Sequence, residues 1–182
     1  MVENIVCTLD NIASDASLHH ELIAHGLFDV IGRFVDLFLS SAKEENDVGV
    51  DETTEGIELS VMPTGPLKLI KAIASVMMKL SQEPQVQRQC IELGMLDVVQ
   101  TCLAKFFDYE LHTWLYIAVG NFAVSGLSAT TPAAKNDHYM QFCADIRRRA
   151  ANAGCVQLLI FGSESSTFFR IRRICSEYLS LL

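Results

Sequence analysis

Five histidines are the side chains of this 182-residue chain best suited to metal binding or proton transfer. Three of them, His19, His20 and His25, gather near the N-terminus, while His112 and His138 stand alone. Two ligands on one face of a helix need a spacing of three or four residues. His20 and His25 are five residues apart. We therefore expect solvated surface histidines rather than a metal centre.

The six cysteines are the other reactive side chains, and they are dispersed among apolar neighbours. None forms a CxxC pair, and no pair has zinc-finger spacing. They stand at Cys7, Cys90, Cys102, Cys143, Cys155 and Cys175. The sequence predicts buried, reduced thiols in a cytoplasmic or nuclear protein, a setting in which disulfides are rare.

Motifs of nucleophilic or phosphate chemistry are missing from the sequence. Gly120 and Gly126 belong to no GxxxxGK[ST] loop, and Ser125 and Ser163 lack the setting of a nucleophile elbow. The acids crowd into one stretch, where repulsion favours solvation over a tuned carboxylate pair. The sequence therefore predicts no catalytic residue, no metal ligand, no cofactor and no enzyme activity.

The formal net charge of −8 argues against nonspecific nucleic-acid binding, which depends on neutralising phosphates. Residues 43–58 hold seven acids against Lys43, and basic clusters stand at 147–149 and 170–173. The arginines at 147–149 are expected to face solvent from a helix. The acidic stretch fits a solubilising surface loop, and it also fits an electrostatic partner for a basic surface. Both interpretations stay open at the level of sequence.

Targeting segments and structural class follow from the apolar pattern. No window approaches the ~20 apolar residues of a membrane-spanning helix, and the first four residues carry no basic leader segment. Glycine and proline are scarce, and the four prolines fall at expected helix ends or loops. These features predict an all-α protein without a secretory signal or a transmembrane segment.

One short phrase occurs three times along the chain. It reads HGLFDVI at 25–31, LGMLDVV at 93–99 and AGCVQLL at 153–159. Each copy follows a polar amphipathic stretch and precedes a further apolar helical pattern. Such repetition indicates a unit that buries its apolar face only by stacking on its neighbours.

The hydrophobic spacing predicts the helices of this unit and their buried apolar stripes. The stripes are Leu27, Val30, Ile31, Phe34, Val35 and Phe38; Leu69, Ile73, Met77 and Leu80; and Leu111, Leu115, Ala118 and Phe122. The helices are expected at 2–13, 17–24, 27–41, from Gly65-Pro66 to about 81, at 84–93, 95–106, from Tyr109 to about 124, at 137–153, 155–161 and 167–182. The repeated glycines are 68 and then 60 residues apart, whereas a three-helix repeat runs ~40–47 residues. Loop insertions at 42–64 and 125–136 account for the excess. We expect a single domain over 1–182.

The pattern resembles the armadillo repeat. The third helix of that repeat ends in a leucine–any–asparagine–leucine–small phrase, which LDNIA at 9–13 and VGNFA at 119–123 match. MMKLS at 77–81 has lysine for asparagine, and SEYLS at 176–180 matches loosely. The resemblance implies a right-handed superhelical solenoid of about three repeats after a leading helix. Within the family, the acidic insertion and the residues Ala118 to Ala123 are most similar to the small-GTPase GDP-dissociation stimulator group.

In armadillo proteins the asparagine lies in a concave groove and hydrogen-bonds the backbone of the bound partner. By position, the resemblance gives that role to Asn11, Lys79, Asn121 and Tyr178. The single tryptophan, Trp114, is two turns before Asn121 on the same helical face and fits either the core or the groove. The tryptophan that nuclear-import receptors place four residues before each asparagine is absent, which argues against binding of basic nuclear-localisation peptides.

The sequence thus predicts a non-catalytic protein-interaction module. The expected partner is a small GTPase that the protein regulates or chaperones, and the alternative is a scaffold or adaptor subunit of a larger assembly. The sequence opens on a predicted third helix and closes at Leu179-Ser180-Leu181-Leu182, and neither end has the pattern of a polar capping unit. Solenoids need such units for solubility, so either the array is longer or its open ends associate, for instance with a second copy.

Overall fold

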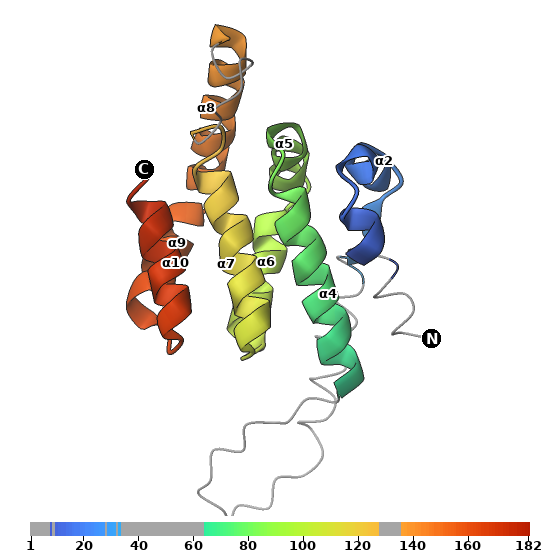
Figure 1. The fold of residues 1–182 in the computed structure, drawn as a ribbon, viewed down its shortest axis with the longest axis vertical. Helices are drawn as coiled ribbons and strands as arrows, with labels where there is room; N and C mark the ends of the chain where they lie inside the picture. The colour runs from blue at the N-terminus through green and yellow to red at the C-terminus, as the bar shows by residue number, and fades with distance from the viewer. Residues whose placement is uncertain (1–7, 9, 28, 32, 34–63, 128–135) are drawn as a thin grey trace, which may run out of the picture.

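The computed structural model describes residues 8, 10–27, 29–31, 33, 64–127 and 136–182 (Figure 1). Throughout this part of the chain the regular structure is helical and no strand occurs. The chain is therefore all-α, as predicted. The acidic stretch 43–58, most of both predicted loop insertions, and Cys7 lie outside the described residues.

The helices begin and end close to the predicted positions. Residues 10–13 are helical and are followed by the 3-10 helix η1 (Ala16–Leu18). The remaining helices are α2 (His19–Ala24), α4 (Thr64–Leu80), α5 (Pro84–Glu92), α6 (Met95–Lys105), α7 (Tyr109–Ala123), α8 (Asp137–Asn152), α9 (Cys155–Ser165) and α10 (Phe169–Leu179).

Local chemistry explains these limits. Asp108 and Asn136 are side-chain N-caps, accepting hydrogen bonds from the backbone of Leu111 and of His138. The repeated glycine has a positive φ in all three copies: 82° at Gly26, 78° at Gly94 and 94° at Gly154. Glycine adopts this conformation without the penalty of a Cβ atom. The sequence phrase that occurs three times therefore forms the same glycine turn at each of its three positions.

Two predictions of detail were wrong. Helix α9 does not end at Phe161 but continues to Ser165. The apolar stripe stops there, but Gly162 is buried against a neighbouring helix and the helical backbone runs on. Val30 was expected in the core and is 45% exposed, because it lies about 100° round the helix from the buried Ile31.

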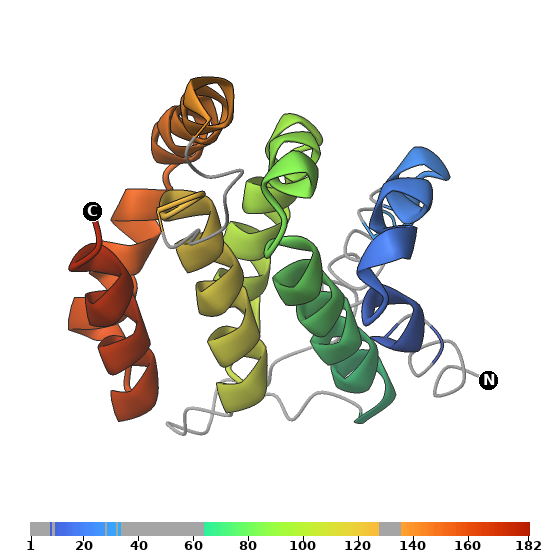
Figure 2. The same ribbon diagram turned by 45° about the horizontal axis from the view of Figure 1, so that its top comes forward.

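The helices form two rows. Helices α4, α7 and α10 lie side by side, with α4 in contact with α7 and α7 in contact with α10 (Figure 1). Helices α2, α5 and α8 follow one another in a second row, with α5 in contact with both α2 and α8 (Figure 2). Helix α9 packs against both α7 and α10.

Helix α7 carries the centre of the core. Nine of its fifteen residues are buried, so it is apolar nearly all round. The two predicted stripes are both buried: Leu69, Ile73, Met77 and Leu80 on α4, and Leu111, Leu115, Ala118 and Phe122 on α7. The interhelical core therefore follows from the sequence pattern.

Two helical glycines let the helices approach one another closely. A Cβ atom on Gly120 would lie 2.2 Å from Cδ2 of Tyr178 on α10. A Cβ atom on Gly162 would lie 2.5 Å from Cε1 of Tyr116 on α7. In both places a tyrosine ring occupies the space that any other residue would fill.

Aromatic rings join the start of α7 to the start of α10. The ring of Phe168 stacks on Phe107 with centroids 5.1 Å apart and meets Tyr109 edge-on at 5.3 Å. His112 lies 6.1 Å from the same ring, and its Nε2 is 2.6 Å from the Phe106 carbonyl oxygen. Burial lowers the pKa of His112 by more than its neighbours raise it.

We expect Gly120→Ala to destabilise the fold by about 1–3 kcal/mol through overpacking against Tyr178. The same change in an open helix interior would stabilise by up to about 1 kcal/mol. In a Tyr178→Ala background the ring is gone, and Gly120→Ala should become neutral or favourable. Chemical denaturation of the four proteins measures the coupling. An equal loss in both backgrounds would contradict the close contact.

We expect the stability of the protein to fall as the pH drops below about 6.5, in part through His112. Because its folded pKa is lowered, the unfolded chain binds the proton at higher pH than the folded chain. His112→Gln should flatten the change in urea midpoint between pH 7.5 and 5.5. His138→Gln, at an exposed histidine, is the control and should retain the wild-type slope. Identical slopes for all three proteins would sink this assignment.

Candidate functional site

Lys79 on α4 forms hydrogen bonds with the N-terminal segment, at Asp10 and Ser14. Its Nζ donates to the backbone carbonyl of Asp10 at 3.1 Å, to the Asp10 carboxylate and to Ser14 Oγ at 3.0 Å. Ser75 Oγ donates to the same carboxylate at 2.7 Å. Burial raises the pKa of Asp10, but the hydrogen bonds from Lys79 and Ser75 outweigh it and hold that pKa below its usual range. Lys79 therefore joins the residue 10–13 helix to α4.

Asn121 on α7 is bonded to both neighbouring helices. Its Nδ2 donates to Oγ of Ser81, directly after α4, at 2.9 Å. Its Oδ1 accepts a hydrogen bond from the Tyr178 hydroxyl of α10, also at 2.9 Å. We call Ser81, Asn121 and Tyr178 the polar row, since they link three neighbouring helices by side-chain hydrogen bonds.

The structure does not gather all five predicted residues. It brings Asn121 and Tyr178 into direct contact and places Lys79 two residues before Ser81. Asn11 is exposed, and its neighbour Asp10 makes the contact with Lys79 instead. Trp114 is partly buried and packs against the hydrophobic core.

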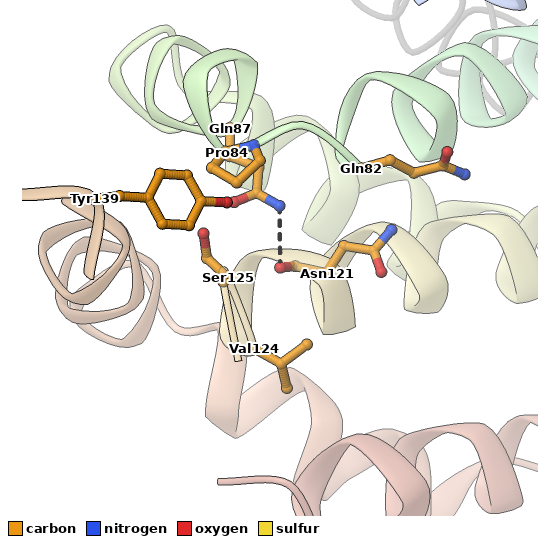
Figure 3. A pocket seen from close by; sticks show the side chains of 8 residues that line it. Gln82, Pro84, Gln87, Asn121, Val124, Ser125 and Tyr139 are labelled. Carbon is orange, nitrogen blue, oxygen red and sulfur yellow. Dashed lines mark hydrogen bonds between the residues drawn. The ribbon is translucent and has the colours of Figure 1, made fainter. Parts of the chain in front are cut away.

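A pocket of about 220 Å³ adjoins the polar row where the end of α7 meets α5 and α8 (Figure 3). Gln82 and Asn121 line it from one side, and its other walls come from Pro84, Gln87, Val124, Ser125, Gly126 and Tyr139. No charged side chain is among these described lining residues. The pocket thus presents amides and hydroxyls over a small apolar wall.

Two polar atoms in this pocket are buried without a hydrogen-bond partner among the described residues. They are Oε1 of Gln87 and Oγ of Ser125, and each residue is only 2% exposed. The Gln87 amide is held in place because its Nε2 donates to the Ser81 carbonyl at 2.6 Å and to the Asn121 carbonyl at 3.2 Å. In Figure 3 the Ser125 side chain and the hydroxyl end of Tyr139 point toward Gln87. Unpaired buried groups are costly and call for an explanation.

The chain after α7 is clamped to α8, which fixes the pocket wall. The Arg147 guanidinium donates to the Ser125 carbonyl. Gly126 has φ +72°, and a Cβ atom there would lie 2.5 Å from Cys143 Sγ. Burial raises the pKa of Tyr139, and the adjacent Cys143 adds to this, so its hydroxyl stays protonated at neutral pH.

The basic cluster 147–149 corrects the prediction of a solvent-facing face. Arg147 is partly buried through its contact with Ser125. Arg149 pairs with Asp145 at 2.7 Å and reaches Glu92 of α5 at 3.4 Å. Consecutive residues point in different directions around a helix, so two of the three arginines meet neighbouring segments.

The N-terminal histidines were predicted to be solvated, and for His19 this was wrong. His19 is 3% exposed, with Nε2 2.9 Å from the Ala13 carbonyl and Nδ1 3.3 Å from a Glu83 carboxylate oxygen. Its ring thereby joins α2 to the segment before it, at Ala13, and to the N-cap residue of α5, Glu83. Among the described residues no group of three His, Cys, Asp or Glu side chains could hold a metal ion.

The cysteines agree with the prediction where they are described. All five in this part of the chain are buried and unpaired. Burial raises the pKa of four of them to about 12: Cys90, Cys102, Cys155 and Cys175. Thiols of this kind are poor nucleophiles at neutral pH.

No family model, curated protein or solved structure matches the chain. Over the described residues, no helix combines the length and the apolar character needed to cross a membrane. The candidate site therefore rests on its own geometry and on the motifs that resemble the armadillo repeat.

The sequence motif indicated Asn121 and Tyr178, whereas it gave no signal for the pocket. Gln82, Gln87 and Ser125 belong to no known pattern, and Ser125 was set aside for lack of a nucleophile elbow. Only the packing of α5, α7 and α8 brings them together.

We expect Tyr178→Phe to lower the free energy of unfolding by about 1 kcal/mol, since it leaves Oδ1 of Asn121 without its donor. In an Asn121→Ala background the same change should cost nearly nothing. Tyr109→Phe is the control, because that hydroxyl lies in an exposed 3.4 Å contact with Arg170. Urea denaturation of these variants tests the bond, and equal costs in both backgrounds would exclude it.

Proposed function

We propose that this chain is a non-catalytic protein-interaction module of armadillo-like repeats that binds a partner along the polar row and the adjoining pocket. The single observation behind the proposal is this continuous site: α7, α10 and the residue directly after α4 contribute one polar side chain each, beside a pocket whose lining residues carry unpaired buried polar atoms. A stacked helical array offers an extended surface of this kind to a partner.

Asn121 retains the hydrogen-bonding capacity that such a role needs. A carboxamide has two N–H donors and two acceptor lone pairs. Asn121 uses one donor on Ser81 and one lone pair on the Tyr178 hydroxyl. One donor and one lone pair remain on a partly exposed side chain, which match the carbonyl and the N–H of a partner backbone.

The partner that we propose first is a small GTPase, which the protein would regulate or chaperone. Support comes from the resemblance of residues 118–123 and of the acidic insertion to the GDP-dissociation stimulator group. The acidic residues 43–58 would speed encounter with a basic GTPase tail. A scaffold or adaptor subunit of a larger assembly is the second candidate, since a stacked helical array offers an extended surface to any protein partner.

The test measures release of a fluorescent guanine nucleotide from a panel of GDP-loaded Rho- and Ras-type GTPases. We expect faster release with the wild-type protein and a loss of roughly tenfold with Asn121→Ala. Gln82→Ala tests the same face without disturbing the polar row, because Gln82 is exposed beside it. Asn152→Ala, at an exposed asparagine of α8, is the matched control and should behave as wild type.

The outcomes separate the candidates. Unchanged nucleotide release together with direct GTPase binding that Asn121→Ala abolishes would favour a scaffold. If neither release nor binding occurs with any GTPase of the panel, the GTPase assignment falls. If Asn121→Ala and Asn152→Ala behave alike toward a GTPase that does bind, the polar row is not the binding face.

A further inference from the structure

We infer that the pocket beside Asn121 binds a neutral amide group of a partner protein. The inference rests on the proposed function, since it names the chemistry that this site recognises. Its basis is the pair of buried, unpartnered atoms, Oε1 of Gln87 and Oγ of Ser125, which belong to two residues that line a pocket of about 220 Å³.

The Gln87 oxygen requires a hydrogen-bond donor. The amide cannot turn over without losing both bonds of its Nε2, to the Ser81 and Asn121 carbonyls. Oε1 is therefore an acceptor with a fixed position, on a residue that is only 2% exposed. A ligand that fills the pocket without an N–H or O–H would leave this oxygen unpaired, as it is in the free protein, and would gain no hydrogen-bonding free energy from it.

The Ser125 hydroxyl supplies the complementary half. A hydroxyl can donate to a carbonyl oxygen, and its own backbone carbonyl is already taken by Arg147. A group with one N–H and one C=O satisfies both Gln87 and Ser125. An amide carries these two functions on adjacent atoms.

The ligand group is neutral because nothing in the pocket would balance a charge. The described lining consists of Gln, Asn, Ser, Tyr, Pro, Val and Gly side chains. Arg147, the nearest cation of α8, is committed to the Ser125 carbonyl, and the raised pKa of Tyr139 keeps its hydroxyl neutral. A carboxylate or an ammonium would lose its hydration without a counter-charge.

The size of the pocket fits part of a partner chain. Its volume of about 220 Å³ exceeds the roughly 150 Å³ of an engineered protein cavity that binds benzene. Pro84 and Val124 supply an apolar wall for the carbon atoms next to an amide. Either a carboxamide side chain or a backbone amide has the right chemistry, so the experiment compares the two sources.

The test titrates isotope-labelled full-length protein with small probes and follows the side-chain NH₂ signals of Gln82, Gln87 and Asn121 by NMR. Benzamide represents a carboxamide side chain and N-methylbenzamide a backbone amide. Acetophenone keeps the shape and the carbonyl but has no N–H, and benzoate carries a charge. We expect at least one of the two amides to shift these signals, acetophenone to bind roughly tenfold more weakly, and benzoate to leave the signals unchanged.

Ser125→Ala is the decisive variant because it separates binding from folding. It removes a buried hydroxyl that has no partner, so the melting temperature should stay unchanged or rise. Amide binding should weaken roughly tenfold. Ser163→Ala is the control, since the Ser163 hydroxyl donates to the Ile160 carbonyl within α9, which does not line the pocket. This variant should bind the probes as the wild-type protein does.

Several results would overturn the inference. No shift with either amide would mean that the pocket holds water only. Equal binding of benzamide and acetophenone would show that Gln87 Oε1 accepts no hydrogen bond from the ligand. Tighter binding of benzoate than of benzamide would contradict a neutral ligand. Amide binding without any GTPase binding would support amide recognition by the pocket and contradict the proposed GTPase function. GTPase binding without amide binding would contradict amide recognition alone.

Discussion

The contact between α7 and α10 at Gly120 governs the arrangement around the candidate site. The missing side chain of Gly120 lets the Tyr178 ring lie against the α7 backbone. The next residue, Asn121, then receives the hydroxyl of the same ring. One residue supplies the space and its neighbour supplies the hydrogen bond, so the distance and the register of the two helices are fixed together. Because α7 also packs on α4 and α9, this register extends through most of the core.

The pocket adjoins the same end of α7, since Asn121 is one of its lining residues. Its walls come from the last turn of α7, from α5 and from α8, and no single helix forms it. Hydrogen bonds from Gln87 tie α5 to the end of α7, and Arg147 ties α8 to the turn beyond it. The surroundings are therefore well bonded, while two atoms inside remain unpaired. Preorganised groups that are unsatisfied in the free protein are what a binding site needs, since a ligand then gains their full hydrogen-bonding free energy.

The reactive residues of the chain serve its packing in the described part of the structure. His19 and His112 each bond a backbone carbonyl six residues earlier, and so close the turn before their helix. Four cysteines, Cys90, Cys102, Cys155 and Cys175, are small apolar groups of the core, and burial raises the pKa of their thiols to about 12. The aromatic contacts of Phe168 join the starts of α7 and α10, opposite the end at which the pocket lies.

The helical class, most helix limits and the buried stripes of α4 and α7 could be predicted from the sequence, because they follow from local spacing, capping residues and the repeated glycine turn. Asn121 and Tyr178 were also predicted, through phrases that resemble the armadillo repeat. The contact at Gly120, the burial of His19 and the pocket shared by Gln87 and Ser125 became apparent from the packing of the helices alone. The physical reason is distance along the chain. Periodicity reports which face of a helix is apolar, but a polar atom becomes unpaired or paired only through residues that folding brings to it from other helices.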